Sequence, residues 1–180
     1  MPGINTIDGF QEYMGGMFKP SIYTVSLVSP YVTAQDLMAE SVTLPGRSIA
    51  TMERRTGHGP QRDMPYERLY SGDLDITFIF AQGTNSHRTN FENWMHHIIS
   101  EPDDFGEGKG NVLQQYESYI GDMWITIEHP GGSEGNFEIN VMEVYPKAIS
   151  PVDLSWTIND AYLRQSVSFG FREYLISSSR

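Results

Sequence analysis

The sequence predicts a mainly β protein, a β-sandwich or partial barrel, with one flanking α-helix and a long polar hairpin or loop. Short stretches in which apolar and polar residues alternate recur through most of the 180 residues, as expected for half-buried strands. Turn-forming sequences such as Pro45-Gly46 and Pro130-Gly131-Gly132 separate these stretches. A single long segment has apolar residues at helical spacing. A sheet-rich chain of this kind buries its apolar faces most simply by packing sheet on sheet.

The first half of the chain contains three predicted strands. Residues 22–28 alternate with period two after Lys19-Pro20, and residues 40–44 form a short strand that ends at Pro45-Gly46. The clearest strand covers residues 73–80 and has one apolar and one polar face. Its apolar face carries Leu74, Ile76, Phe78 and Phe80, and its polar face carries Asp73, Asp75 and Thr77.

The second half contains the helix and three further strands. An apolar stripe predicts a helix over residues 86–100, and the stripe consists of Phe91, Trp94, Met95, Ile98 and Ile99. Strands are predicted over residues 123–128, 137–145 and 165–175. We expect one domain over residues 1–180, with an N-terminal lead at 1–16, a projecting hairpin or loop at 47–68 and a frayed tail at 176–180.

The polar segment 47–68 is unusually rich in arginine. It holds five of the chain's 12 basic residues, which are Arg47, Arg54, Arg55, Arg62 and Arg68. One interpretation is a solvated hairpin whose charge is balanced by Glu53, Asp63 and Glu67. The other is a projecting arm that contacts an acidic surface on a neighbouring copy, because the planar guanidinium binds carboxylates in a bidentate manner.

Composition narrows the possible partners. The 23 acidic and 12 basic residues give a formal net charge of −11, which argues against a nucleic-acid-binding surface. The charge is compatible with a protein past which DNA slides, and also with ordinary solubility. The chain has no cysteine, which excludes disulfides and fits assembly in a reducing cytoplasm. No apolar run is long enough to span a bilayer, and the first residues lack a signal-peptide pattern.

No motif points to catalysis, to a cofactor or to a metal ion. The five histidines lack the spacing of a metal site, and His96 and His97 are adjacent on the predicted helix. The acidic stretch 101–107 lacks the order of a calcium-binding loop. No nucleophile elbow or phosphate-binding loop occurs. We therefore expect no catalytic, cofactor-binding or metal-binding residue, and no enzymatic activity.

Several motifs occur in an order that is typical of one family. In the C-terminal third, Val144-Tyr145-Pro146 is an aromatic-Pro strand end and Leu154-Ser155-Trp156 is a Leu-x-Trp strand. An Asn-containing turn at Asn159-Asp160 and an alternating final strand at residues 165–174 follow. This order resembles the C-terminal signature of the tail tube proteins of contractile-tailed bacteriophages. Similar elements occur earlier, at residues 17–25, 41–49, 74–80 and 91–94. The resemblance covers residues 17–175, and the long N-terminal lead and the Arg-rich hairpin depart from it.

The resemblance implies a structural virion protein. Family members form hexameric rings whose inner strands join into one barrel, and the rings stack into a tube through which DNA is ejected. The implied partners are further copies of the chain, the tail sheath, baseplate and terminator proteins, and DNA that passes without specific binding, with no membrane. The protein would reside in the phage tail after assembly in the host cytoplasm. The five arginines would form a contact arm, and Asp73 and Asp75 would face the lumen, a neighbouring ring or solvent.

Other assignments remain open from the sequence. The same fold could serve as a baseplate tube initiator, or as the tube of a phage-like bacteriocin or a type VI secretion system. A more distant alternative is a carbohydrate-binding β-sandwich that uses exposed aromatic residues such as Trp124, Trp156 and Tyr162.

Overall fold

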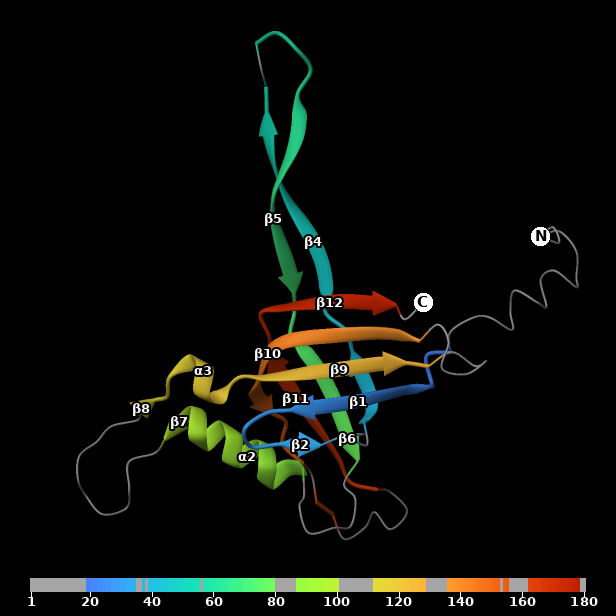
Figure 1. The fold of residues 1–180 in the computed structure, drawn as a ribbon, viewed down its shortest axis with the longest axis vertical. Helices are drawn as coiled ribbons and strands as arrows, with labels where there is room; N and C mark the ends of the chain where they lie inside the picture. The colour runs from blue at the N-terminus through green and yellow to red at the C-terminus, as the bar shows by residue number, and fades with distance from the viewer. Residues whose placement is uncertain are drawn as a thin grey trace, which may run out of the picture.

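The chain folds as two antiparallel sheets that share one long strand, β10 (Figure 1). The structure, a computed structural model, describes residues 19–34, 37, 39–55, 57–79, 87–100, 112–128, 136–152, 154–155 and 162–178. The first sheet has the order β2 (Thr33–Ala34), β1 (Tyr23–Val28), β9 (Gly121–Ile127), β10 (Phe137–Ile149) and β12 (Glu173–Ser178). The second has the order β10, β11 (Arg164–Gly170), β6 (Leu74–Ile79) and β3 (Ala39–Thr43).

The other elements surround this sandwich. A long hairpin projects from it, built from β4 (Gly46–Arg54) and β5 (Arg62–Ser71). Two helices lie at its side, α2 (His87–Ile98) and α3 (Tyr116–Tyr119). A two-residue ladder joins β7 (Ile99–Ser100) to β8 (Val112–Leu113). Within the described ranges, no helix is long and apolar enough to cross a bilayer.

β10 belongs to both sheets because it bends at its centre. Its first half pairs with β9 and β12, and its second half pairs with β11. The ladder to β9 changes register between Val141 and Val144. Glu143 lies inside this bulge with φ of 55°, a left-handed conformation that few residues other than glycine adopt.

The chain also passes from the second sheet back to the first at the turn from β11 to β12. The amide of Arg172 in this turn donates to the carbonyl of Met142, at 3.2 Å. Its guanidinium forms an ion pair with Glu143, at 2.6 Å. The strand before the turn passes close to β10, since a Cβ atom at Gly170 would lie 2.6 Å from the ring of Tyr145. The two crossings are therefore tied to each other.

The prediction of a single strand over residues 165–175 is wrong. The structure has two strands, which are separated at Phe171 and Arg172. Alternation of side chains continues across the turn, so a periodic pattern does not reveal that the chain has changed sheets. The second strand also runs on to Ser178, where it pairs with Phe137.

The core lies between the inner faces of the two sheets. Alternate residues of each strand contribute to it, as the sequence pattern predicts. The first sheet provides Val25, Leu27, Met123, Ile125, Ile139 and Val141, and the second provides Leu74, Ile76, Phe78, Val167 and Phe169. The predicted apolar face of residues 73–80 is thus confirmed, except for Phe80, which lies outside the described residues.

Helix α2 closes one side of the core. Phe91 and Trp94 are fully buried, and the ring of Phe91 lies 5.2 Å from that of Phe78 between centroids. The indole N–H of Trp94 donates to the carbonyl of Tyr119, at 2.6 Å, which joins α2 to α3. The predicted stripe is confirmed at Phe91 and Trp94, whereas Ile99 belongs to β7 and is exposed.

The predicted fold class is confirmed, and the strand ends differ. β10 continues to Ile149, beyond the predicted end at Tyr145, because a second register shift after Pro146 keeps the chain in the sheet. Helix α3 and the two-residue strands are too short to produce a periodic pattern, so the expectation of a single helix was incomplete. The segment 47–68 forms a hairpin. The lead at 1–16, Trp156 and Asn159-Asp160 lie outside the described residues.

The Trp94 hydrogen bond gives a test of the fold. Substituting Trp94→Phe should lower the free energy of unfolding by about 1–3 kcal/mol, because the buried carbonyl of Tyr119 loses its donor. Urea unfolding followed by far-ultraviolet circular dichroism measures the change. Trp124→Phe is the matched control, since Trp124 is only partly buried on β9 and should tolerate the same substitution. Equal losses in both variants would contradict the assignment.

Candidate assembly interface

The β4–β5 hairpin stands away from the sandwich (Figure 1). In the part of the chain that the structure describes, its two strands pair only with each other. Nine residues in β4 correspond to a length of about 30 Å. Gly57 follows β4 with φ of 62°, a conformation that glycine adopts without strain. An isolated two-stranded hairpin is only marginally stable in water, so a covering surface would stabilise the part of this one that projects beyond its base.

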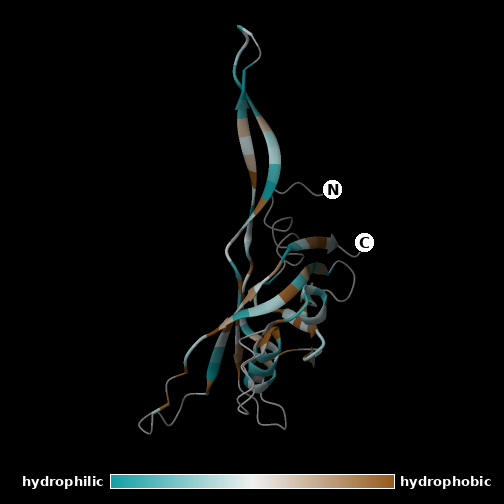
Figure 2. Cartoon of the chain, turned by 90° about the vertical axis from the view of Figure 1, so that its left-hand side faces the viewer, coloured by the Kyte–Doolittle hydropathy of each residue, from teal (hydrophilic) through white to brown (hydrophobic). Residues whose placement is uncertain are grey.

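Apolar side chains are exposed along the hairpin. Tyr66 is 63% exposed and Ile49 is 61% exposed, and Figure 2 shows hydrophobic segments along both strands. The complete set is Ile49, Met52, Met64, Tyr66 and Leu69. Apolar groups gathered on one projecting element indicate a surface for another macromolecule.

Arg47 fixes the base of the hairpin to the sandwich. Its guanidinium lies over the ring of Tyr174, 4.3 Å from the centroid, and 5.5 Å from the centroid of the Tyr70 ring. It also donates a hydrogen bond to the backbone carbonyl of Tyr174. Tyr174 lies on β12, an edge strand of the first sheet. Arg47 therefore satisfies an edge carbonyl and holds the hairpin by a cation–π contact.

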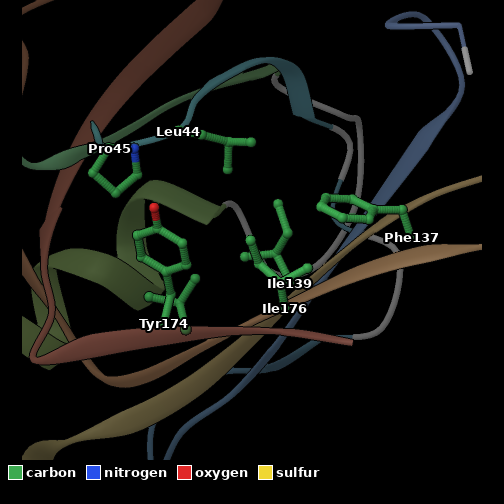
Figure 3. Close-up of a pocket in the computed structure, with 7 residues that line it drawn as sticks. Leu44, Pro45, Phe137, Ile139, Tyr174 and Ile176 are labelled. Atoms are coloured by element: carbon green, nitrogen blue, oxygen red, sulfur yellow. The ribbon is translucent and has the colours of Figure 1, made fainter. Parts of the chain in front are cut away.

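An apolar pocket of about 140 Å³ opens beside this base (Figure 3). The turn between β3 and β4 forms one wall, and β10 and β12 form the other. Its lining residues are Leu44, Pro45, Phe137, Ile139, Val141, Tyr174 and Ile176. Because β3 and β12 are the edge strands of their sheets, the pocket marks the open seam of the sandwich.

The outer end of the hairpin separates opposite charges onto two faces. Glu53 is directly opposite Asp63, and Arg54 is directly opposite Arg62. Partners across a ladder share a face, and successive residues of a strand point to opposite faces. One face therefore presents two carboxylates and the other presents two guanidinium groups.

The five arginines predicted to form a contact arm do not lie on one surface. Arg54 and Arg62 come together near the tip, and Arg55 follows directly after β4. Arg68 is opposite Ile49, so it projects from the face that carries Glu53. Arg47 is engaged within its own chain. The contact role of these residues stays a prediction.

Asp73 and Asp75 lie on the outer face of the second sheet. Asp73 forms an ion pair with Lys147, at 2.8 Å, and Asp75 accepts a hydrogen bond from the hydroxyl of Ser168. The hydroxyls of Thr77 and Ser166 are 2.9 Å apart on the same face. The ion pair with Lys147 neutralises the charge of Asp73. Of the two aspartates predicted to face the lumen, Asp75 therefore contributes more negative charge to this surface.

The corner at Glu143 gathers three polar side chains. Hydrogen bonds to Glu143 come from the Arg172 guanidinium, at 2.6 Å, and from the Tyr116 hydroxyl, at 2.8 Å. The Arg172 contact is the main reason that the pKa of Glu143 lies below its usual value. Burial, followed by the hydrogen bond to this carboxylate, raises the pKa of Tyr116 to about 12. Both shifts keep the network ionised as Glu⁻ and neutral Tyr at neutral pH.

The sequence analysis did not identify the contact that anchors the hairpin base, or the separation of opposite charges onto the two faces of its tip. Tyr174 is 127 positions from Arg47, and nothing local signals their contact. The separation of charges at the tip, by contrast, could have been predicted from the sequence. Glu53 and Asp63 are equally far from His58, as are Arg54 and Arg62, and a hairpin that turns there must place each pair opposite each other.

Comparisons with known proteins agree with this architecture. Residues 21–177 match a model of the phage tail tube protein family. A search of curated proteins finds no match. The fold resembles a chain of the sheath/tube terminator of the extracellular contractile injection system PVC, with 15% identity, a TM-score of 0.62, and coverage of 89% of this chain and 96% of that chain. It also resembles the tube-terminating cap of the anti-feeding prophage (15% identity, TM-score 0.63, 91% and 92% coverage). A chain of the PVC sheath–tube complex is similar as well, with 16% identity, a TM-score of 0.59, and coverage of 90% of this chain and 92% of that chain.

The Arg47 contacts predict how firmly the hairpin is held. Spin labels on Thr51→Cys and Glu117→Cys can be placed cleanly, because the chain has no cysteine of its own. Arg47→Ala should broaden the label-to-label distance distribution, since a cation–π contact of about 0.5–1 kcal/mol is lost. Arg68→Ala is the control, because Arg68 lies on the same hairpin face without a ring contact in the described structure. An unchanged width in Arg47→Ala would refute the anchoring role.

The Glu143 corner predicts a pH dependence of stability. A carboxylate with a lowered folded pKa stabilises the protein above its unfolded pKa, and this contribution is lost as the pH falls through the folded pKa. Glu143→Gln should therefore cost about 0.5–1 kcal/mol at pH 7, and the difference from wild type should vanish under acidic conditions. Chemical unfolding at several pH values measures it. Glu138→Gln, on the same strand, is the control and should show no such convergence.

Proposed function

Since the chain belongs to the phage tail tube protein family, we propose that its copies close into hexameric rings that stack into the inner tube of a contractile tail. A subunit of this kind has unpaired strand edges at β3 and β12, which invite pairing with other chains. A head-to-tail interface closes into a ring when its rotation permits, and closure removes the free edges.

The projecting hairpin is the observation that carries this proposal. It exposes apolar and charged side chains along its length, and a two-stranded hairpin gains little stability by itself. The pocket at its base offers an apolar side chain of a neighbouring copy a place to bind. Both features are explained if the covering surface belongs to another subunit.

The acidic charge suits a conduit for DNA. A ring of six copies would carry a formal charge of −66, six times −11. A negative lumen would repel phosphates and let the genome slide without binding. We assign the polar face of β6 and β11 to the lumen, with Asp75 as its main uncompensated charge. The tube would contact sheath, baseplate and terminator proteins in the virion, after assembly in the host cytoplasm.

Negative-stain electron microscopy of the purified protein, at low and high concentration, tests the proposal. Rings that grow into long hollow tubes would support a tube subunit and count its copies. Single rings that never elongate would instead indicate a terminator or baseplate component with the same fold. Monomers that persist at high concentration would refute self-assembly as the function of the isolated chain.

The lumen assignment predicts an effect of charge on ejection. Replacing Asp73 and Asp75 together by Lys should slow DNA release, because basic groups in the lumen would bind phosphates. Phage particles carrying the variant tube would be triggered in vitro and followed with a DNA-binding dye. Glu117→Lys combined with Glu138→Lys changes the charge equally at other positions and should leave the rate unchanged. Ejection at the wild-type rate from the Asp73/Asp75 variant would remove these residues from the lumen.

A further inference from the structure

The charges near the hairpin tip are arranged against the stability of a lone hairpin. Like charges directly opposite each other in a ladder are destabilising, and the tip has two such pairs, Glu53 with Asp63 and Arg54 with Arg62. In the described chain, no ion pair or side-chain hydrogen bond of these four residues relieves the repulsion. Within the described residues this cost has no compensating side-chain contact, so an oppositely charged surface outside the chain would relieve it.

The two faces of the tip are complementary to each other. The cationic face carries Arg54 and Arg62, with the exposed pair Met52 and Met64 next to it on the same side. The opposite face carries Glu53 and Asp63 near the tip and is called anionic for this pair, although Arg68 lies on it nearer the base. Contact between the same faces of two copies would bring like charges together. Contact between opposite faces would form guanidinium–carboxylate pairs, and Arg is well suited to bind carboxylates in this way.

We propose that neighbouring copies around a ring stack their hairpins face to face, each placing its Arg54–Arg62 face on the Glu53–Asp63 face of the next. The inference rests on the proposed ring assembly and specifies its contact chemistry. Every hairpin then has one neighbour on each side, and both like-charge pairs are neutralised. The contact has a fixed direction, because the two faces differ. Such heterologous contacts propagate in one sense and close into a ring when the rotation between neighbouring copies permits.

Charge reversal on each face tests this contact. The variant Glu53→Arg, Asp63→Arg has two cationic faces, and the variant Arg54→Glu, Arg62→Glu has two anionic faces. Each should fail to form rings alone, while an equimolar mixture should form them again, because the two variants alternate around an even-numbered ring. The conservative variant Arg54→Lys, Arg62→Lys should assemble. Circular dichroism of each variant establishes that the subunit is folded.

Cross-linking tests the same contact without altering any charge. Thr51 lies on the anionic face and Met52 on the cationic face, each next to the charged pairs. A chain with Thr51→Cys and Met52→Cys, oxidised with copper phenanthroline, should give a ladder of disulfide-linked species that stops at the ring size. Neither single variant should give more than a trace of dimer.

The outcomes separate the inference from the function on which it rests. Wild-type protein that forms no rings would overturn the proposed function. Wild-type rings together with normal assembly of either charge-reversed variant alone would overturn the face-to-face contact. A cross-linked ladder that continues beyond the ring size would place the contact between stacked rings and overturn the arrangement around the ring. The expected result is that the mixture of charge-reversed variants forms rings again and that the disulfide-linked ladder stops at the ring size.

Discussion

The ion pair between Glu143 and Arg172 joins the bend of β10 to the turn between β11 and β12, two of the places where the chain changes sheets. Glu143 is in a left-handed conformation, which costs about 1–2 kcal/mol for a residue with a Cβ atom. The hydrogen bonds that it accepts from Arg172 and Tyr116 offset this cost. Because β10 bends there, one strand serves both sheets, and β12 can return beside the first half of β10. Without that return there would be no Tyr174 beneath Arg47, and the hairpin would have no base.

The buried core and the exposed hairpin are separate parts of the fold. Most of the buried side chains lie in the two sheets and α2, whereas the hairpin contributes exposed ones. Substitutions in the first group should alter the free energy of unfolding, and in the proposed assembly substitutions near the tip should alter how copies meet. Solved structures of the same fold share only 15–16% identity with this chain, so the sandwich is kept while most side chains differ.

Alternation and turn residues were sufficient to predict most strands and the helix. Leu74, Ile76 and Phe78 occupy the core as their spacing requires, and the hairpin turns within the glycine-rich centre of its segment. The failures concern contacts between distant segments. The pairing of Asp73 with Lys147 and of Arg47 with Tyr174 depends on which strands are neighbours and in what register. No local pattern contains that information, and the break at Phe171 and Arg172 was missed for the same reason.

The length of the hairpin gives its base a mechanical importance that burial does not reveal. Over about 30 Å of strand, a rotation of about 5° at the base displaces the tip by about 2.5 Å, close to the length of one hydrogen bond. The angle at which the hairpin leaves the sandwich is set by a few groups around Arg47. A small change in the position of Arg47 or of the edge of β12 is therefore amplified into a larger displacement of the hairpin tip.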